Sequence, residues 1–377
     1  MTTPAEILSR AFELARPEVL GIPAYNAGLS AEAVRRKYPT GKIARLASNE
    51  NPLGASSQIG NALAQCDSAI YPDANSERLR AALSARCGVP ASHIVVGNGS
   101  EDIIKMICEA FLRPNDRVVT VTPSFGLHES YPLLMGASVC KVPLTSRMTF
   151  DVPALISALA GGCHVLMFSN PSNPVGCHMT AEQLREVIDA TPENALIVLD
   201  EAYYEYARGK DYPDSLAILR EQTRPWIVLR TFSKAYGLAG LRVGYGLASD
   251  ADIIGLLDRV RTPFNVNAYA QTAAITALGD EPHVRETVQL ADAQREVVTR
   301  ALAAMDLWCA PSLANFLFVD VRQPATQVAE YLLGHGVIVK PWKEAGYETF
   351  IRVTLGAEQD NMAFVKALST YFGLDHS

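Results

Sequence analysis

The chain has 377 residues, of which 49% are hydrophobic and 19% charged, and this composition indicates a globular protein with a large core rather than a disordered chain. The formal net charge of −7 argues against a nucleic acid or an anionic membrane surface as partner, because both bind basic faces. No apolar run reaches the roughly 18 residues of a membrane helix, and the N-terminus lacks the apolar core of a signal peptide.

The seven cysteines are odd in number and widely spaced, and none forms a CxxC pair. This usage is typical of reduced thiols, so we expect a cytoplasmic location and no disulfide framework. Cys163-His164 and Cys177-His178 resemble two metal half-sites. Neighbours in a strand point to opposite faces, so we expect no metal centre at these pairs.

The first 50 residues include a loose arm, GIPAYNAGLS. Beyond it, short aliphatic runs alternate with amphipathic helical stretches, which predicts an α/β fold with a mostly parallel sheet between helices. Helix starts are expected at Ser100 and at Thr180, where Gln183 completes a capping box. The expected strands of this sheet are His93–Val96, Arg117–Val121, His164–Phe168, Ala195–Leu199 and Trp226–Leu229.

A long charged helix is expected at about residues 281–305, as a hinge to a second, smaller α+β domain. The sequence predicts an N-terminal arm and part of the small domain in residues 1–50, a large domain in 51–282, and the small C-terminal domain in 283–377. The small domain is thus built from both chain ends. Its expected strands are Phe316–Val319, Gly336–Val339 and Phe350–Thr354.

Polar clusters follow the ends of the strands expected in the large domain. They are GNGSED, PSF, SNPSNPVG, DEAYYEY and RTFSKAYG, which begin at residues 97, 123, 169, 200 and 230. The carboxyl edge of an open α/β sheet is where ligands bind. We therefore expect one composite site at this edge rather than unrelated loops.

Lys234 is the candidate reactive centre of that site. It follows a strand and lies between Phe232 and Tyr236, and partial burial lowers the pKa of a lysine and makes its amine a nucleophile toward an aldehyde. Ser233 and Arg242, after a glycine-rich turn, are placed to hold a phosphate dianion with it. Taken alone, Lys234 and Arg242 each also fit a structural role.

Asp200 ends a buried strand, where a carboxylate needs a partner such as a protonated heteroaromatic nitrogen. A simple helix cap is the alternative role for Asp200. Tyr203 and Asn173 suit a phenolic oxygen on the same ring, and Phe125 suits stacking on its face. The sequence thus indicates a flat aromatic ligand with a ring nitrogen.

Gly99, Ser100 and Glu101 open a helix whose free backbone N–H groups suit phosphate. Asp102 stands where a GxGxxG dinucleotide fingerprint has its last glycine, and the chain has neither a Walker loop nor a GxSxG motif. Together the clusters fit a ligand with a phosphate, a ring nitrogen, a phenolic oxygen and an aldehyde for the lysine. Pyridoxal 5′-phosphate has these groups.

At this point the motifs resemble those of a known family. GNGSED, SNPSNPVG, DEAYYEY and TFSKAYGLAGLRVGY, in this order, resemble the fold-type I pyridoxal-phosphate aminotransferases. LASNENPLG (46–54), IYPD (70–73), FLRPND (111–116) and GVIVKPW…FIRVTLG (336–356) are similar to histidinol-phosphate aminotransferases. The resemblance covers the chain from about Ile22 to Leu374.

The resemblance implies a role for each residue of the cofactor site. Lys234 bonds to the cofactor aldehyde and carries a proton between substrate and cofactor, and Asp200 pairs with the ring nitrogen. Asn173 and Tyr203 bind the ring oxygen, and Phe125 stacks on the ring where most relatives have tyrosine. The phosphate is expected to bind Gly99, Ser100, Glu101, Ser233 and Arg242, together with Tyr71 of the neighbouring subunit of a homodimer with shared sites.

The resemblance also implies the substrate side of the site. Arg352 binds the anionic end of the substrate, Tyr25 on the arm closes over it, and Asn51 lies at the pocket edge. Lys340 stands where some histidinol-phosphate enzymes have an arginine that holds the substrate phosphate. Lysine holds phosphate as a point charge rather than through a two-pronged fork, which leaves an unphosphorylated substrate open.

The reaction implied belongs to histidine biosynthesis: histidinol phosphate gives its amino group to 2-oxoglutarate, leaving imidazole acetol phosphate and glutamate. Because of Lys340, an aromatic amino-acid aminotransferase is the main alternative, and a threonine-phosphate decarboxylase of the same fold is a more distant one. A non-catalytic cofactor sensor is disfavoured because Lys234 and Asp200 are intact and no DNA-binding helices are attached. The missing fingerprint disfavours a dehydrogenase.

Overall fold

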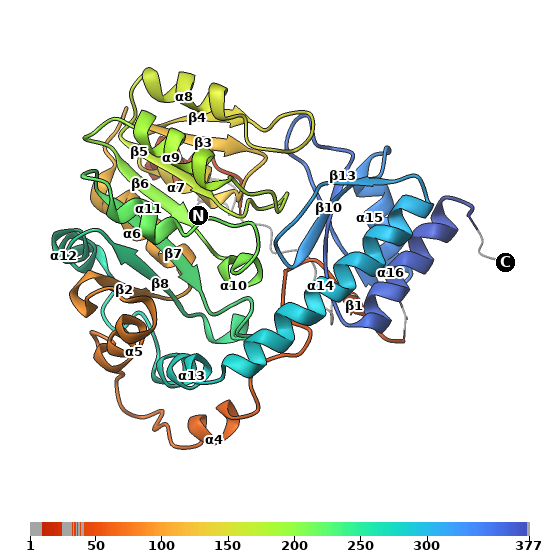
Figure 1. Cartoon of the computed structure of the whole chain (residues 1–377), viewed down its shortest axis with the longest axis horizontal. Helices are drawn as coiled ribbons and strands as arrows, with labels where there is room; N and C mark the ends of the chain where they lie inside the picture. The colour runs from red at the N-terminus through yellow and green to blue at the C-terminus, as the bar shows by residue number, and fades with distance from the viewer. Residues whose placement is uncertain are drawn as a thin grey trace, which may run out of the picture.

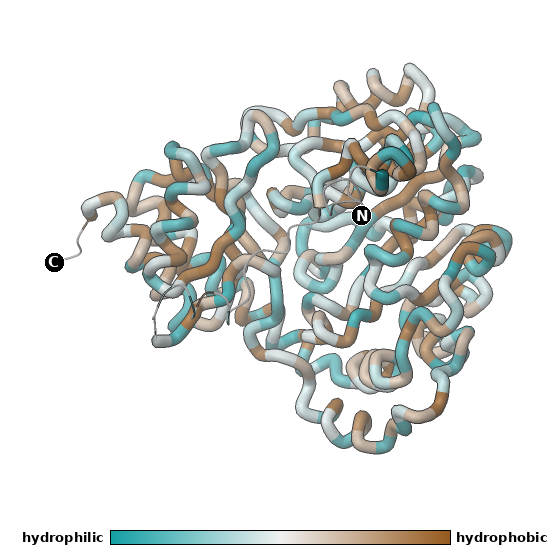
Figure 2. The backbone as a smooth tube through the Cα atoms, turned by 180° about the vertical axis from the view of Figure 1, so that it is seen from behind, coloured by the Kyte–Doolittle hydropathy of each residue, from teal (hydrophilic) through white to brown (hydrophobic). Residues whose placement is uncertain are grey.

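The computed structural model describes residues 10–24, Glu32, Val34, Arg36, Tyr38 and residues 41–374. Figure 1 shows two lobes joined by the long helix α14 (Glu281–Ala304). The large lobe holds a seven-stranded sheet, and the small lobe holds a four-stranded sheet. Hydrophobic stretches run through the interior of each lobe (Figure 2). No helix within the described ranges is long and apolar enough to cross a membrane.

The strands of the large sheet lie in the order β2-β8-β7-β6-β5-β3-β4. Only β8 runs antiparallel to its neighbours, so β2 runs in the same direction as the other strands. This confirms the predicted α/β fold with a mostly parallel sheet. The strands are β2 (Ile94–Gly97), β3 (Arg117–Thr122), β4 (Ser138–Pro143), β5 (Val165–Ser169), β6 (Leu196–Asp200), β7 (Trp226–Thr231) and β8 (Gly244–Ala248).

The five strands expected from the sequence are all present, each within one or two residues of the predicted ends. The sequence missed β4, an edge strand with several exposed residues, and β8, whose two glycines read as a turn. A Cβ atom on Gly244 would lie 2.4 Å from the Ser100 nitrogen, and one on Gly246 would lie 2.9 Å from the Ile227 side chain. Gly244 therefore lets β8 lie close against the start of α6 (Ser100–Phe111), and Gly246 leaves room for the Ile227 side chain of the neighbouring strand.

Helices cover both faces of the large sheet, and each face has its own hydrophobic cluster. The helices α6, α7 and α12 pack on one face, and α5, α8, α9, α11 and α13 pack on the other. The capping box of Thr180 and Gln183 is present. The bounds are α5 (Glu77–Cys87), α6 (Ser100–Phe111), α7 (Leu127–Leu134), α8 (Val152–Ala160), α9 (Ala181–Ala190), α11 (Ser215–Arg220), α12 (Ala251–Val260) and α13 (Ala268–Leu278).

The small lobe is a sheet of order β12-β13-β10-β9 packed against α14, α15 (Ala325–Gly334) and α16 (Glu358–Tyr371). Near the N-terminus, β1 (Ala44–Arg45) pairs in parallel with β11 (Val337–Ile338). Residues 44–45 thus join the C-terminal part of the chain in this lobe, whereas α2 (Pro17–Leu20) lies against α7 of the large lobe. The predicted domain boundaries at 50/51 and 282/283 stay predictions. The small sheet consists of β9 (Trp308–Cys309), β10 (Phe316–Asp320), β12 (Lys340–Pro341) and β13 (Phe350–Thr354).

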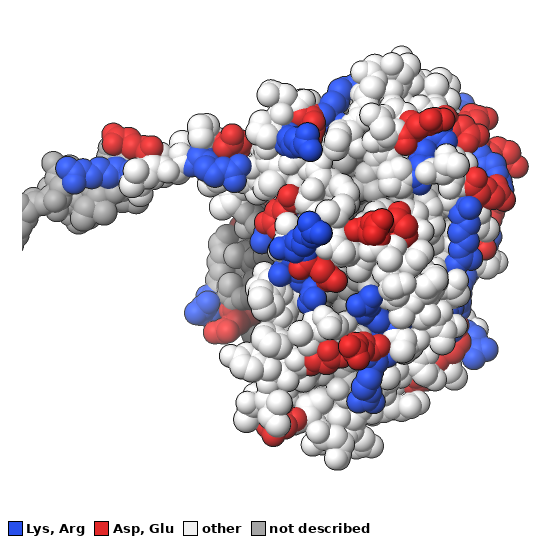
Figure 3. Space-filling model, turned by 90° about the vertical axis from the view of Figure 1, so that its left-hand side faces the viewer, with Lys and Arg blue, Asp and Glu red and all other residues white. Residues whose placement is uncertain are grey.

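Short elements complete the chain. They include α2 (Pro17–Leu20), α4 (Ile59–Leu63), α10 (Tyr204–Ala207) and two 3-10 turns, at Ala91–His93 and Ala239–Leu241. On the face shown in Figure 3, basic and acidic side chains are interspersed and form no continuous basic surface. That face offers no extended cationic surface for a polyanion.

Candidate active site

The carboxyl ends of the parallel strands bring the predicted polar clusters together. Asp200 is the last residue of β6 and lies in register with Ser169, the last residue of β5, and with Leu229 of β7. The chain then leaves β7 toward Ser233 and Lys234, and leaves β2 toward Gly99. The composite site expected from the sequence therefore has its backbone framework at one edge of the sheet.

Lys234 is half-buried, and its Nζ donates to the Ser48 carbonyl at 3.1 Å. Burial lowers the pKa of Lys234 to about 8; the charges of Arg352 and Arg242 act in the same direction, and Glu50 opposes them. With that pKa, about a tenth of the amine is neutral at pH 7, some 300-fold more than for an ordinary lysine near 10.5. The side chain is therefore a usable nucleophile near neutral pH.

Asp200 is buried, with 3% of its surface exposed. Its Oδ2 lies 3.2 Å from Nε2 of His128 on α7, and its Oδ1 accepts the backbone N–H of Ala202 at 3.0 Å. The residue at the N-cap of α10 is Tyr203, so Asp200 is not that helix cap. The buried carboxylate is thus held by a histidine at one oxygen and by the backbone at the other, and its pairing with a ring nitrogen stays a prediction.

The sequence did not single out His128, which is fully buried. Its ring makes an edge-to-face contact with Phe125, with centroids 5.6 Å apart. Both residues belong to the PSFGLHE segment, and the His128 backbone N–H donates to the Phe125 carbonyl at 2.9 Å, but the sequence carries no signal for the contact with Asp200. His128 thus contacts both Phe125 and Asp200 and links the two predicted cofactor residues.

Asn173 and Tyr203 are both buried and both held by neighbours. Arg352 donates through Nη1 to Asn173 Oδ1 at 2.6 Å and through Nη2 to the Ala47 carbonyl at 2.7 Å. Asn49, which the sequence did not single out either, donates to Tyr203 Oη at 2.9 Å. Because Asn173 accepts from Arg352, its amide nitrogen is left to donate in another direction. The predicted substrate arginine and the predicted cofactor ligand Asn173 therefore share one polar cluster.

Arg242 and Ser233 lie together where α6 begins. Arg242 reaches Ser233 Oγ at 3.4 Å through Nη1 and Glu101 Oε1 at 2.9 Å through Nη2. Gly99, the N-cap of α6, has φ +83°, and a Cβ atom there would lie 2.4 Å from Arg242 Nη2. Glycine is therefore required for the guanidinium to reach the helix start, whose backbone N–H groups from Ser100 onward attract anions.

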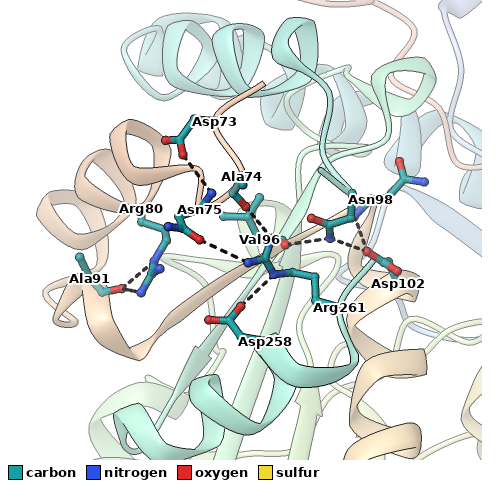
Figure 4. Close-up of polar contacts among 11 residues, drawn as sticks. Asp73, Ala74, Asn75, Arg80, Ala91, Val96, Asn98, Asp102, Asp258 and Arg261 are labelled. Carbon is teal, nitrogen blue, oxygen red and sulfur yellow. Dashed lines mark hydrogen bonds and ion pairs between the residues drawn. The ribbon is translucent and has the colours of Figure 1, made fainter. Parts of the chain in front are cut away.

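The turn before α6 is fixed by Asp102, as Figure 4 shows. Its Oδ2 accepts the backbone N–H of Asn98 at 2.9 Å and the side-chain amide of Asn265 at 2.8 Å. In the same view, Arg261 donates to the Ala74 carbonyl and to Asp258. The acidic residue that breaks the dinucleotide fingerprint thus has a structural role in this turn.

The remaining predicted residues lie in different surroundings. Tyr71 is 79% exposed and stacks on Phe264 at 4.6 Å, on the surface. The Asn51 side-chain amide donates to the Ala235 carbonyl and to Thr287 Oγ1, both at 3.0 Å. These bonds tie the loop after Lys234 to α14, so a substrate contact by Asn51 stays a prediction. Tyr25 lies outside the described residues.

Lys340 and Arg352 lie directly opposite each other in the antiparallel pair of β12 and β13. Side chains at such positions point to the same face of a sheet, and like charges there repel. Burial lowers the pKa of Lys340, with Arg352 and Lys343 acting in the same direction. Two basic residues thus lie opposite each other on one face of the sheet, and one of them, Arg352, also contacts Asn173. A bound anion would offset their repulsion.

Comparisons with known proteins agree with this geometry. The family model for aminotransferase class I and II matches residues 41–368. Histidinol-phosphate aminotransferase 1 of Mesorhizobium japonicum is 48% identical, over 96% of this chain and 99% of its own length. Histidinol-phosphate aminotransferase 3 of Rhizobium meliloti is also 48% identical, over 94% of this chain and 96% of its own length.

Among solved structures, a histidinol-phosphate aminotransferase from Sinorhizobium meliloti, in complex with pyridoxal-5′-phosphate, matches with a TM-score of 0.88 and 27% identity. The match covers 97% of this chain and 99% of that one. The likeness extends over both lobes, as expected for fold type I. This chain belongs to the class I and II aminotransferase family.

Proposed function

We propose that this chain is a pyridoxal-phosphate-dependent histidinol-phosphate aminotransferase, which transfers the amino group of histidinol phosphate to 2-oxoglutarate. The observation that carries the choice of substrate is the cross-strand pair of Lys340 and Arg352 beside Asn173. A dianionic phosphate gains from both charges, whereas the carboxylate of an aromatic amino acid is satisfied by the arginine fork. The two relatives that are 48% identical carry the same activity in their names.

The residues present fit pyridoxal phosphate. The missing Cβ at Gly99 leaves Arg242 free to reach the helix start, and Ser233 adds a hydroxyl. We assign the phosphate to these groups, to the backbone of Ser100 and Glu101, and to Tyr71 of a neighbouring subunit. The buried Asp200 carboxylate offers the counter-charge for the ring nitrogen.

Three other residues complete the proposed cofactor site. Asn173 and Tyr203 donate to the ring oxygen, and Phe125 lies against the ring face. When bound, pyridoxal phosphate supplies an aldehyde that receives the amino group and a ring that withdraws electrons from the reacting carbon. The protein supplies the orientation and the charges that make this withdrawal effective.

Lys234 performs the proton transfer in this proposal. Its lowered pKa of about 8 allows Nζ to hold a proton and to release it near neutral pH. Asp200 pairs with the ring nitrogen in this proposal, and His128 holds the Asp200 carboxylate in place. Each step assigned to the chain is therefore a binding, positioning or proton-transfer step.

A substrate panel tests the assignment. The purified protein, loaded with cofactor, is mixed with histidinol phosphate, phenylalanine, tyrosine or threonine phosphate, and the change of cofactor absorbance is followed. We expect the largest kcat/KM for histidinol phosphate. A larger value for an aromatic amino acid, or carbon dioxide release from threonine phosphate, would replace the proposed substrate.

We also propose that two copies of the chain form a homodimer. Apolar side chains are exposed near the predicted shared residue: Tyr71 is 79% exposed, Ile70 67% and Phe264 40%. Side chains of this kind are depleted on the surfaces of monomers and mark interfaces.

We also propose a cytoplasmic location for the chain. The seven cysteines are free thiols, which supports this location.

A further inference from the structure

A short segment, residues 46–49, lies between the two lobes and links the proposed substrate and cofactor residues. Each of its four consecutive carbonyl groups accepts a hydrogen bond from another part of the chain. The four donors, in order along the segment, are the backbone of Thr354 to Leu46 at 2.8 Å, Arg352 to Ala47 at 2.7 Å, Lys234 to Ser48 at 3.1 Å, and Asn315 to Asn49 at 3.0 Å.

Within this segment, Asn49 has a side chain whose orientation is fixed by its neighbours. It is 1% exposed, and its φ of +57° is a conformation that asparagine tolerates better than most residues. The Asn49 backbone N–H donates to Thr354 Oγ1 at 2.9 Å, so the Thr354 hydroxyl is an acceptor there. Its own proton is then available for Asn49 Oδ1, which lies 3.1 Å away.

This arrangement decides which end of the Asn49 amide faces Tyr203. Because Oδ1 accepts from Thr354, the Nδ2 group faces Tyr203 Oη, at 2.9 Å, and it can only donate. The Tyr203 oxygen is therefore an acceptor toward Asn49. The tyrosine proton must be directed to some acceptor other than Asn49.

We propose that Asn49 is a positioning residue that sets the direction of the Tyr203 hydroxyl, so that Tyr203 donates to the ring oxygen of the cofactor. Thr354 lies two residues after Arg352 on β13, and residues so spaced share a face of a strand. Asn49 thereby joins the cofactor side of the site to the strand that carries the proposed substrate arginine. The inference rests on the cofactor binding in the proposed function and is independent of which amino donor is used.

Asn49→Asp tests the direction of this hydrogen bond. A carboxylate keeps the shape of the side chain and tolerates the same backbone conformation, but it accepts where the amide donated. The Tyr203 proton would then turn toward the new carboxylate, and the ring oxygen would lose a donor. A hydrogen-bond donor favours the ionised form of the ring oxygen. Loss of the donor therefore raises the pH midpoint, which is the pH at which the visible absorbance band of the bound cofactor is half changed. We expect a rise of about one pH unit, measured without any amino donor.

Asn49→Gly separates direction from charge. Glycine accepts the positive φ and removes the donor without adding a charge, so we expect a midpoint rise smaller than that of Asn49→Asp. Both variants are then combined with Tyr203→Phe. If Asn49 acts through Tyr203, Asn49→Gly should not shift the midpoint further in that background, and any shift that Asn49→Asp still causes there measures its added charge alone. Equal shifts with and without the tyrosine hydroxyl would overturn the proposal.

Asn361→Asp is the matched control. Asn361 is a buried amide of the same lobe, 2% exposed, and it bonds to Gly356 and Gln294. Asn361→Asp should lower Tm and leave the absorbance midpoint within about 0.2 pH units of the wild-type value. If Asn361→Asp shifted the midpoint as much as Asn49→Asp does, Asn49 would have only a structural role. Because no amino donor is present, these results stand apart from the substrate panel, in which a wrong proposed function would be seen as poor turnover of histidinol phosphate.

Discussion

His128 Nε2 lies 3.2 Å from Asp200 Oδ2, and both side chains are buried. The contact holds the carboxylate by its Oδ2 atom, while the Ala202 backbone holds Oδ1. A charge kept in a buried, prearranged position acts on a bound ring more strongly than the same charge in water. Asp200 is therefore the residue whose charge, rather than shape, should matter most.

Asp200→Asn removes that charge and keeps the shape. We expect Tm to change little and kcat to fall by about 100- to 1,000-fold, or roughly 3–4 kcal/mol, the size of effect seen when one prearranged electrostatic contact is lost. Steady-state turnover with one amino donor and 2-oxoglutarate measures the fall. A kcat within threefold of wild type would mean that the carboxylate has only a structural role.

Lys234 should react with amine reagents near neutral pH. Its pKa of about 8 means that Nζ becomes neutral as the pH rises through 8, well before an ordinary lysine does. In the protein without cofactor, the rate of acetylation at Lys234, followed by mass spectrometry, should rise steeply between pH 7 and 9 and then level off. The exposed Lys343 is the comparison for reagent reactivity in the same sample.

Arg352→Gln should move that profile in a known direction. Arg352 is the largest charged contributor to the low pKa of Lys234. Its removal favours the protonated amine, so the pKa should rise and the acetylation midpoint should shift to higher pH. An unchanged midpoint would separate Arg352 from Lys234 and leave burial and Arg242 as the causes of the low pKa.

Mixed subunits test the proposed dimer. If Tyr71 serves the neighbour's phosphate site, a heterodimer of Tyr71→Phe and Lys234→Ala subunits contains one site with both native residues. After verified subunit exchange, activity should exceed the mean of the two parent dimers. Activity at or below that mean would place Tyr71 outside the neighbour's site.

Lys340→Ala probes the second cation of the proposed substrate site. Loss of one charged hydrogen bond to phosphate should cost about 1.5–3 kcal/mol, which is a rise in KM for histidinol phosphate of roughly 10- to 100-fold. The KM for phenylalanine should change by less than about threefold, because a carboxylate is satisfied by the Arg352 fork. Lys340→Arg is the matched control and should retain the phosphorylated substrate. Equal changes for both donors would remove Lys340 from the phosphate site.

The edge of the sheet on which the site is proposed could be predicted from the sequence, because polar residues directly follow the aliphatic runs that form the strands. Asp200 and Lys234 could be recognised in that way, each directly beyond an aliphatic run. The strand β8 could not be recognised, because Gly244 and Gly246 are there for close packing against α6 and against a neighbouring strand, whereas the local propensity of glycine favours a turn. Tertiary packing overrides propensity at that strand.

His128 and Asn49 show a second limit. Asn49 lies 154 positions from Tyr203 in the chain, and His128 lies 72 positions from Asp200. Neither contact leaves a spacing pattern, and each partner becomes visible only when the strands and the 46–49 segment are placed in space. Residues that act through another residue are therefore the ones that sequence patterns miss.

The proposed action on histidinol phosphate is tested most directly in the wild-type protein. The measurement compares kcat/KM for histidinol phosphate with kcat/KM for phenylalanine and for tyrosine, with 2-oxoglutarate as acceptor. The two cations of Lys340 and Arg352 predict a preference for the phosphorylated donor of at least tenfold, equivalent to about 1.4 kcal/mol. A higher kcat/KM for phenylalanine or tyrosine would contradict the account and make the protein an aromatic amino-acid aminotransferase.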